Sequence, residues 1–451
     1  MSFPLTQKNY DAVIVGAGPA GSIAAKYAAF GGIDVLFVDR KREIGAPIQC
    51  AGFTPDASEI EKLIPGMTLP KEMKKLPKNS ILCKTKKQRL YTPDLKSKEF
   101  DVDGYVLDRR IFDTELAEQA ASAGAELLCG TTVTSVLSGS TKHTVRLHGI
   151  FGKFDVTTKV IIGADGPNSF IGKTFGLCHN TKTTASDSAI GSMGQFENTG
   201  PQERMGRPES TVSDLANSIS DFDYGNDSGY ERGIGFEYKM TDVDIDSDSL
   251  EMFFGNKYVP GGYIWIFPEG DGKANVGIGL RKSLCTEKLS AREFLNRFIR
   301  EHPIASEKLK GGKITSVIAG IIPVSGAPAR TATNSVMVAG DAAGHVMATN
   351  GGGIPFAMAA GKIAGEVAAE AVLEDQCGRG LSTAAYEQRW RAEFGEALDA
   401  SVQARKLMDK FLVSDTRINA AFKLLPADKM KEMQCGKISG TMKRGLDLLL
   451  K

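Results

Sequence analysis

Glycine and aspartate residues near the start of the chain have the spacing of a phosphate-binding loop. Gly16, Gly18 and Gly21 form a GxGxxG motif that includes Ala20. Such a loop lets the backbone approach a pyrophosphate and directs a helix N-terminus at its negative charge. Asp39 follows at the distance at which a carboxylate can accept hydrogen bonds from an adenosine ribose. The pattern predicts a dinucleotide-binding site.

The neighbouring segments predict the strand, turn and helix that this motif needs. Residues 10–15 are an apolar run typical of a strand, and residues 22–30 are alanine-rich and typical of a helix. A second strand is predicted for residues 34–38, directly before Asp39. Because the chain contains 50 glycines, the motif alone is weak evidence. Its agreement with strand, helix and acid carries the prediction.

Two later motifs indicate the same cofactor. Asp165 follows a predicted buried strand at residues 160–164 and precedes a glycine. Asp341 follows a glycine and another buried strand at residues 335–339. A carboxylate at the end of a buried strand is costly unless it is hydrogen-bonded, and the ribitol hydroxyls of FAD would bond to Asp341. Asp165 also fits a purely structural role as the cap of the next turn. The three pieces together predict FAD.

The segment after the second Gly-Asp motif predicts another helix N-terminus beside the cofactor. Asn350 is followed by three glycines, Ile354 and a proline, and residues 356–373 are apolar and alanine-rich. Proline is favoured in the first turn of a helix, and the N-terminus carries a partial positive charge. That charge would stabilise an anionic reduced flavin. We expect Gly353 and Ile354 to contact the cofactor through backbone N–H groups.

Composition excludes several classes of protein. A chain of 451 residues with 42% hydrophobic residues should form two or three domains. Its net charge of +1 argues against a nucleic-acid partner. Without a long apolar stretch or a signal-peptide pattern, we expect a soluble, cytoplasmic protein. The seven cysteines are scattered without a CxxC pair, so we expect no metal site and no iron–sulfur cluster. Electrons must come from another molecule.

The pattern of predicted elements indicates a discontinuous cofactor domain. We predict an α/β chain, α+β overall, with a Rossmann-like FAD-binding domain, an antiparallel β-sheet substrate domain and a C-terminal helical region. A lysine-rich stretch at residues 73–89 is expected to be solvated surface. The predicted boundaries are 1–180 and 320–380 for the FAD-binding domain, 181–319 for the substrate domain, and 381–451 for the helical region.

The three cofactor motifs resemble those of the p-hydroxybenzoate hydroxylase-like FAD superfamily, over about residues 10–375. Within this range, residues 260–268 read PGGYIWIFP and are similar to the PxxYxWxFP signature of geranylgeranyl reductases, flavoenzymes that saturate isoprenoid chains. Arg109-x-x-Phe-Asp and the loop at residues 49–52 also fit that family. The resemblance implies a reductase of geranylgeranyl C=C bonds, with digeranylgeranylglycerophospholipids, archaeal membrane lipid precursors, as the expected substrates.

The resemblance also implies roles for individual residues. Arg109 would reach the FAD pyrophosphate, for which a planar bidentate donor is suited, although an exposed arginine at a helix end is the alternative. Val133 lies in a strand that would pass beside adenine and offer its backbone groups. Cys50, Ala51 and Gly52 would lie beside the flavin.

Cys50 is the sharpest single-residue hypothesis. Reduction of an unactivated alkene needs a hydride and a proton, and a thiol with a pKa of about 8.5 is a weak acid for this purpose. We therefore expect Cys50 to relay or position a proton. A small buried hydrophobic residue is the alternative.

The aromatic residues of the signature would act on the lipid chain. Tyr263, Trp265 and Phe267 alternate along a predicted strand and so share one face. The resemblance places that face above the flavin, where aromatic rings would hold the chain and favour a cation-like transition state. Plain core packing is the alternative, and it is the more common role of such a stripe.

Two other functions remain open at this stage. An FAD-dependent aromatic monooxygenase or halogenase shares the superfamily fold, although YIWIFP departs from the WxWxIP pattern of halogenases. A non-catalytic prenyl-lipid carrier is the other. For a reductase, the electron donor would be NADPH, a reduced deazaflavin, or a protein such as ferredoxin. We expect a monomer that contacts the membrane peripherally, and the basic, apolar stretch at residues 406–451 is a candidate contact.

Overall fold

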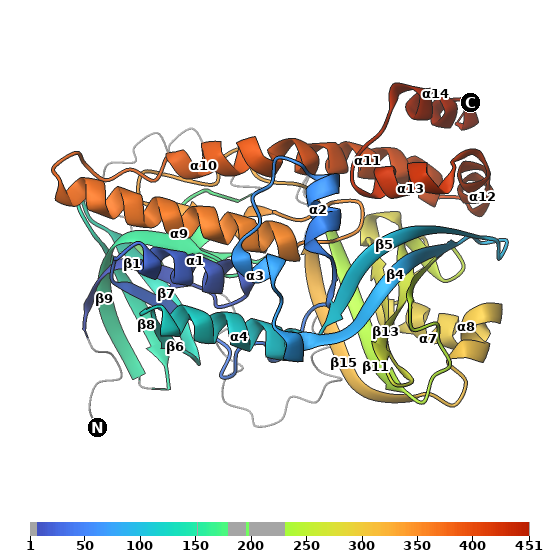
Figure 1. The fold of residues 1–451 in the computed structure, drawn as a ribbon, viewed down its shortest axis with the longest axis horizontal. Coiled ribbons are helices and arrows are strands. Elements are labelled where there is room, and N and C mark those ends of the chain that lie inside the picture. The colour runs from blue at the N-terminus through green and yellow to red at the C-terminus, as the bar shows by residue number, and fades with distance from the viewer. Residues whose placement is uncertain (1–6, 151, 179–194, 198–230, 451) are drawn as a thin grey trace.

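The computed structural model describes residues 7–150, 152–178, 195–197 and 231–450 (Figure 1). Two eight-stranded sheets lie at opposite ends of the long axis, and helices cover them. The sequence predicted this fold class correctly. Apart from residues 195–197, the part of the predicted substrate domain before residue 231 lies outside the described residues.

The first sheet has the strand order β10-β7-β8-β9-β1-β2-β6, and β16 pairs with β9. Its strands are β1 (Asn9–Val15), β2 (Val35–Val38), β6 (Glu126–Leu128), β7 (Thr131–Ser138), β8 (His143–Gly149), β9 (Gly152–Gly163), β10 (Gln195–Glu197) and β16 (Val336–Val338). The pairs β1–β2, β1–β9, β9–β16 and β2–β6 are parallel.

The register of the parallel strands brings the three cofactor motifs to one edge. Val15 of β1 pairs with Val38 of β2 and with Gly163 of β9. Gly163 also pairs with Val338 of β16. Each motif follows its strand within a few residues, so all of them lie at the carboxyl ends of the strands. This is the edge at which open α/β sheets bind their ligands.

Helices α1 (Pro19–Phe30) and α9 (Ile354–Gln376) pack closely because α9 carries glycines at the contact. A Cβ atom on Gly361 would lie 2.3 Å from the Ala20 carbonyl oxygen, and one on Gly365 would lie 2.4 Å from that of Ala24. These pairings show that the two helices run parallel. Both N-termini therefore point towards the carboxyl edge of the first sheet, and α4 (Arg109–Ser122) packs beside α1 (Figure 1).

The second sheet has the order β15-β11-β14-β13-β12-β4-β5-β3 and contains strands of the predicted substrate domain. Its strands are β3 (Phe53–Pro55), β4 (Ile81–Tyr91), β5 (Ser97–Leu107), β11 (Arg232–Thr241), β12 (Ser249–Gly255), β13 (Val259–Gly270), β14 (Lys273–Leu280) and β15 (Lys313–Pro323).

The sheets divide the chain differently from the predicted boundaries. Residues 53–107 were expected in the FAD-binding domain, but their strands extend the second sheet. The expectation of plain surface for residues 73–89 was wrong for the part that forms β4. The lysines at positions 84, 86 and 87 are exposed, whereas Thr85 and Gln88 are buried. A strand with one solvated face therefore has the composition of a surface loop.

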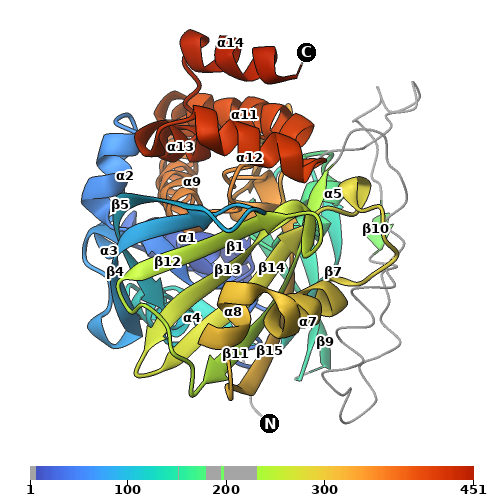
Figure 2. The same cartoon turned by 90° about the vertical axis from the view of Figure 1, so that its right-hand side faces the viewer.

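Helices cover both faces of the second sheet (Figures 1 and 2). Helices α7 (Ala291–Glu301) and α8 (Pro303–Lys308) pack on one face, where Phe294 and Phe298 are fully buried. The C-terminal helices α11 (Glu396–Leu412), α12 (Asp415–Leu424), α13 (Ala427–Gln434) and α14 (Gly440–Leu449) pack on the other face, whereas α10 (Ala385–Trp390) packs against α9. The short helices are α2 (Ala57–Leu63), α3 (Lys71–Lys74) and α5 (Phe170–Thr174).

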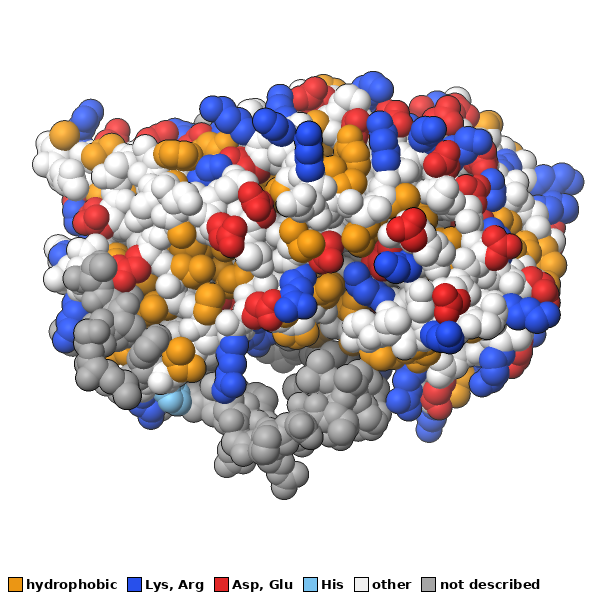
Figure 3. Space-filling view, turned by 60° about the horizontal axis from the view of Figure 1, so that its bottom comes forward, with side chains coloured by type: hydrophobic (Ala, Val, Ile, Leu, Met, Phe, Trp, Pro, Cys, Tyr) orange, Lys and Arg blue, Asp and Glu red, His pale blue; other side chains and the backbone are white. Residues whose placement is uncertain are grey.

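The surface is mixed in charge. On the face shown in Figure 3, acidic and basic side chains are interspersed, in keeping with the net charge of +1. Within the described ranges, none of the helices combines the length and the apolar character that a membrane span requires.

The contact between α1 and α9 gives a stability test. Gly361→Ala should lower the free energy of unfolding by about 1–3 kcal/mol, because its Cβ overlaps the Ala20 carbonyl oxygen. Urea unfolding followed by circular dichroism measures the change. Gly440→Ala is the matched control, since its Cβ meets no atom within 4 Å. Equal stability of the two variants would contradict this account of the packing.

Candidate active site

The glycine-rich loop is tight on its protein side and open on the other. Gly16 has φ +103°, and a Cβ atom on Gly21 would lie 1.8 Å from the Gly16 carbonyl oxygen. By contrast, a Cβ on Gly18 would meet no atom of the described chain within 4 Å. Gly18 is also the N-cap of α1, and no described side chain caps this helix. Uncapped N–H groups beside open space fit a bound pyrophosphate.

Asp39 holds the loop in place and retains capacity for a ribose. Its two carboxylate oxygens each accept one backbone hydrogen bond, from Ala17 N at 2.8 Å and from Lys41 N at 2.8 Å. Each oxygen can accept a further bond. Thr131 N donates to the Asp39 carbonyl oxygen at 2.8 Å, so β7 starts beside this acid. Val133 follows with its side chain in the core, which leaves its backbone for any contact with adenine.

Asp165 caps the turn that follows it, which is the structural role considered above. Its carboxylate accepts hydrogen bonds from Ser169 Oγ at 2.5 Å, from Phe170 N at 2.7 Å and from Ile171 N at 3.1 Å. Burial raises the pKa of this carboxyl group, while these donors oppose that shift. A direct contact between the Asp165 side chain and FAD stays a prediction.

Asp341 fits a ligand that donates hydrogen bonds. No described group donates to its carboxylate, and burial raises its pKa to about 6, with Arg109 acting in the opposite direction. A Cβ on Gly353 would lie 3.5 Å from Asp341 Oδ1, so the acid adjoins the start of α9. Gly353 is the N-cap of α9, which has no side-chain cap among the described residues. A cofactor with hydroxyl donors and an acceptor edge would satisfy both groups.

The loop before α9 is bonded to the second sheet. Tyr263 of β13 donates its hydroxyl hydrogen bond to the Asn350 carbonyl oxygen at 2.5 Å. The Asn350 side chain accepts a bond from Gly352 N at 2.9 Å, and Gly351 has φ +72°. The aromatic strand and the glycine loop therefore meet at this point, and a roof above the flavin stays a prediction from the resemblance.

The Cys50 loop is fixed against the end of β5. Gly52 has φ +82°, and a Cβ atom on it would lie 2.3 Å from the Leu107 carbonyl oxygen. Leu107 N donates to the Gly52 carbonyl oxygen at 3.0 Å. Gly52 N also lies 3.4 Å from Cys50 Sγ and donates to it. The half-buried Ala51 packs towards the second sheet.

Arg109, at the start of α4, has a largely buried guanidinium group. It binds Asp113 through Nε–Oδ1 at 2.9 Å and Nη2–Oδ2 at 3.0 Å, and its side chain is 14% exposed. The alternative of an exposed helix-end arginine is therefore wrong. Burial raises the pKa of the Cys50 thiol, and Arg109 opposes the rise. Contact of Arg109 with a pyrophosphate stays a prediction.

The other two aromatic residues of the signature are buried. The indole N–H of Trp265 donates to Asn275 Oδ1 at 2.8 Å, and its ring lies 2.3 Å from the position of a Cβ on Gly277. Trp265 and Phe267 both join the core beneath the C-terminal helices. These two side chains therefore have the core-packing role that was the alternative to substrate contact. Direct contact of Trp265 with a substrate stays a prediction, whereas Tyr263 is only partly buried.

Sequence reasoning missed Glu237, a buried acid of β11. Its side chain accepts a hydrogen bond from Asn275 Nδ2 at 2.8 Å, and burial raises its pKa to about 7. Glu237 pairs with Gly277, which pairs with Trp265, so the acid projects from the aromatic face of the sheet. Its charge raises the pKa of both Cys50 and Tyr263. Alternating polar residues in β11 are typical of a strand with a solvated face. Only the tertiary structure shows that the acid is covered, with 4% of the residue exposed.

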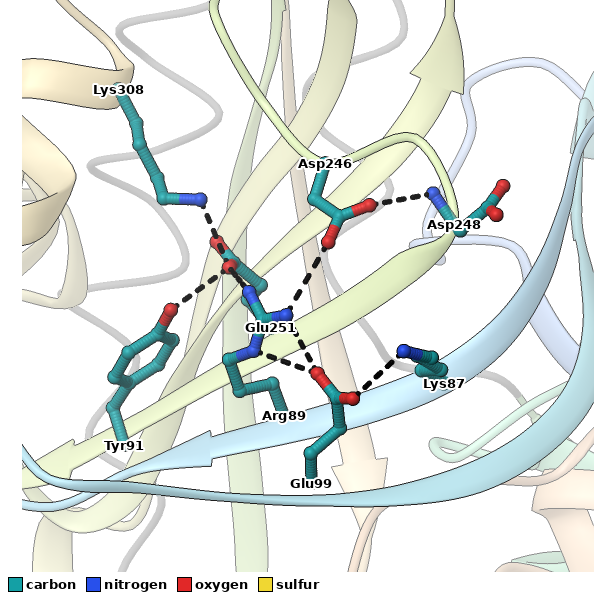
Figure 4. Close-up of polar contacts among 8 residues, drawn as sticks. All are labelled: Lys87, Arg89, Tyr91, Glu99, Asp246, Asp248, Glu251 and Lys308. Atoms are coloured by element: carbon teal, nitrogen blue, oxygen red, sulfur yellow. Dashed lines mark hydrogen bonds and ion pairs between the residues drawn. The ribbon is translucent and has the colours of Figure 1, made fainter.

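A second charged cluster belongs to the opposite face of the sheet (Figure 4). Glu251 of β12 accepts hydrogen bonds from Arg89 at 3.2 Å, from Tyr91 at 3.1 Å and from Lys308 at 3.0 Å. Glu251 pairs with Ile266, so it points away from the face of Trp265. The cluster attaches α8 to the sheet and has no place in the site.

Two parts of the chain match models of known protein families. Residues 9–202 match an FAD binding domain, and residues 232–322 match the geranylgeranyl reductase catalytic domain. The second match includes the aromatic strand, Glu237 and Asn275.

Similar proteins cover nearly the whole chain. Digeranylgeranylglycerophospholipid reductase 2 of Methanopyrus kandleri is 32% identical over 95% of this chain and 93% of its own length. Digeranylgeranylglycerophospholipid reductase of Methanosarcina acetivorans is 33% identical over 87% and 83%, respectively.

Solved structures share the fold. A geranylgeranyl bacteriochlorophyll reductase-like protein from Thermoplasma acidophilum superposes with a TM-score of 0.74 at 24% identity, covering 98% of this chain and 99% of that one. A flavin-dependent brominase has a TM-score of 0.62 at 16% identity, covering 95% and 93%. The fold is therefore common to different flavin chemistries.

The isolated carboxylate of Asp341 gives a test that depends on pH. Its pKa is raised to about 6 in the folded protein, so without FAD the group destabilises the fold increasingly as the pH rises from about 4 through 6. Asp341→Asn should remove this loss, stabilising the FAD-free protein at pH 7 by about 1–3 kcal/mol. The same variant should bind FAD about tenfold more weakly or worse, because a charge-assisted acceptor is lost.

Thermal unfolding at several pH values and FAD titration by fluorescence measure the two effects. Asp399→Asn, at an exposed position of α11, serves as the control. If Asp341→Asn binds FAD as tightly as the unsubstituted protein, Asp341 does not contact the cofactor.

Proposed function

The chain belongs to the geranylgeranyl reductase family, and we propose that it saturates the geranylgeranyl chains of digeranylgeranylglycerophospholipids. It is a flavin-dependent oxidoreductase that reduces C=C bonds of geranylgeranyl lipids. The specific lipid class is supported by the two relatives of that name, each more than 30% identical over most of its length.

One observation carries the mechanism: Tyr263 is bonded to the loop before the uncapped start of α9, and Gln49 of the Cys50 loop lies against Gly320 of the same sheet as Tyr263. When bound, FAD supplies the hydride chemistry. The residues that would hold it are Gly16, Gly18, Ala20, Gly21, Asp39, Cys50, Ala51, Gly52, Arg109, Val133, Asp165, Asp341, Gly353 and Ile354.

Cys50 would relay the proton to the alkene. Its thiol stays protonated at neutral pH because burial raises its pKa, and the Gly52 N–H group fixes the position of the sulfur. A proton held at Sγ can pass to the alkene carbon that does not receive the hydride. The aromatic face with Tyr263 and Trp265 would align the chain and exclude water.

Electrons would come from an external reductant. The chain carries a single GxGxxG loop, which FAD would occupy. NADPH, a reduced deazaflavin and a protein such as ferredoxin are the proposed donors. We propose that the enzyme works as a monomer.

The C-terminal helices offer a surface for membrane contact. Leu448 of α14 is 69% exposed, and Leu449 beside it is also exposed. Leu424 of α12 lies against Gly445 of α14. Lys443 and Arg444 are exposed on α14. Apolar side chains flanked by basic ones suit the interface of an anionic membrane.

Substitution of Cys50 tests the reductase mechanism. Cys50→Ala should retain FAD and lose lipid saturation by about 10²-fold or more, because the positioned proton is absent. The enzyme is reduced with dithionite without oxygen and given a geranylgeranyl lipid, and mass spectrometry counts the pairs of hydrogen atoms gained. Cys377→Ala, at an exposed thiol, is the control.

Unchanged turnover of Cys50→Ala would remove Cys50 from the mechanism. If the flavin-loaded, reduced wild-type protein adds no hydrogen, the reductase assignment itself is wrong. Oxygen-dependent hydroxylation or halogenation, or purification without flavin, would favour the other two functions considered above.

The membrane contact is tested by flotation with vesicles of anionic phospholipid. Leu448→Glu should reduce the bound fraction several-fold, because it places a negative charge in the apolar patch. Leu373→Glu is the matched control, since this leucine is exposed at the far end of α9 (Figure 1). Equal loss of binding in both variants would contradict the assignment of the surface to α14.

A further inference from the structure

Glu237 occupies a position in which an acid serves no evident structural purpose. It lies in the middle of β11, between Gly277 of β14 and Ile318 of β15, and is 4% exposed. Burial of a carboxyl group away from a cation is costly. On this face Lys239 is paired with Glu269 at 2.9 Å, so the nearest lysine of β11 is already engaged.

A relay of hydrogen bonds fixes the orientation of the acid. An indole N–H can only donate, so the Trp265 bond requires Asn275 to present its oxygen to the indole and its NH₂ group to Glu237. Glu237 Oε2 is therefore an acceptor whether the carboxyl group is ionised or not. When the group is protonated, its proton lies on Oε1, for which the described residues offer no hydrogen-bond partner.

The acid faces the Cys50 loop. Gly320 of β15 pairs with Gly235 of β11, and a Cβ atom on Gly320 would lie 3.2 Å from the Gln49 carbonyl oxygen. Paired residues of an antiparallel sheet project to the same side, and Glu237 is two residues beyond Gly235 on that side. The loop that carries Cys50 therefore lies over the face from which Glu237 projects.

Charged and titratable groups surround Glu237 from several elements. They are Lys239 of its own strand, Glu269 and Tyr263 of β13, Arg109 of α4, and Cys50. Arg109 interacts with both Cys50 and Glu237. Ionisation of Cys50 disfavours ionisation of Glu237, and the reverse also holds, because like charges repel in a site of low dielectric constant.

We propose that Glu237, oriented by Asn275 and Trp265, is the proton reserve that restores the Cys50 thiol after each reduction. This inference rests on the proposed function. The Cys50 S–H bond breaks as a C–H bond forms on the alkene, which leaves a thiolate. The O–H bond of the Glu237 carboxyl group then breaks as the S–H bond forms again, and the carboxylate takes a proton from solvent. Neither residue is oxidised or reduced.

The position of the acid suits repeated reduction. Burial raises the pKa of Glu237 to about 7, so a substantial fraction keeps its proton at neutral pH. A thiolate beside it would raise that pKa further until the proton has moved. The thiol could then be restored as soon as one double bond has been reduced, and the carboxylate takes up its next proton from solvent before the following reduction.

Glu237→Gln tests the coupling directly, because glutamine retains an acceptor for Asn275 and carries no titratable proton. Timed alkylation with iodoacetamide, resolved by peptide mass spectrometry, gives the apparent pKa of Cys50. The variant should alkylate Cys50 several-fold faster at alkaline pH, since the glutamate charge that raises the thiol pKa is gone. This measurement needs neither substrate nor a reduced cofactor.

The rate of lipid reduction provides the second test. After one double bond has been reduced, further reduction by the variant should be about 10- to 100-fold slower. In the wild-type enzyme that step should slow as the pH rises through 7, whereas in the variant it should be independent of pH. Glu237→Asp should restore the pH dependence of the second reduction. If Glu237→Gln fails to fold, the rates of Glu237→Asp and wild type across the pH range still show whether the second reduction slows as the pH rises.

Glu251→Gln is the matched control, a buried glutamate of the same sheet on the opposite face (Figure 4). It should leave Cys50 alkylation unchanged. Identical alkylation and reduction profiles for Glu237→Gln and wild type would overturn the proposal while lipid saturation by the wild type stands. A wild-type protein that reduces no lipid would overturn the proposed function, and the alkylation arm would still decide whether Glu237 and Cys50 are coupled.

Discussion

The close parallel contact of α1 and α9 is the constraint on which the site depends. Gly361 and Gly365 bring the two helix backbones together, so two uncapped N-termini face the same edge of the first sheet. One would meet the pyrophosphate and the other the flavin. A helix N-terminus attracts negative charge only within its first turn, so this charge distribution requires the helices to be held close and in register.

A second constraint is the cost of burying charge. Arg109 is paired with Asp113, yet it also interacts with Asp341, Cys50 and Glu237. Burial favours the neutral form of each of these three acids, and the guanidinium group opposes it. The balance leaves two carboxyl groups with pKa values of about 6 and 7 beside a protonated thiol. A reduction that consumes one proton for each double bond suits such a site.

The second sheet decides which chemistry the shared fold supports. Gly277 leaves space for the Trp265 ring to lie across the strands, and the ring in turn orients Asn275 and Glu237. A flavin-dependent brominase shares the overall fold. A fold of this kind positions the flavin, whereas the residues that face it determine whether hydride, oxygen or halide chemistry follows.

The sequence by itself determined the cofactor motifs, the parallel strands that carry them, and the aromatic signature, because each is a local pattern of spacing. It left open whether Asp165 caps a turn and whether Trp265 is core, since both depend on neighbours distant in the chain. It assigned residues 53–107 to the FAD-binding domain although their strands belong to the second sheet, because a half-solvated strand looks like surface. Only the tertiary structure decided that Glu237 is buried beside Cys50. A strand's sequence shows its alternation but not which strands and loops cover each face.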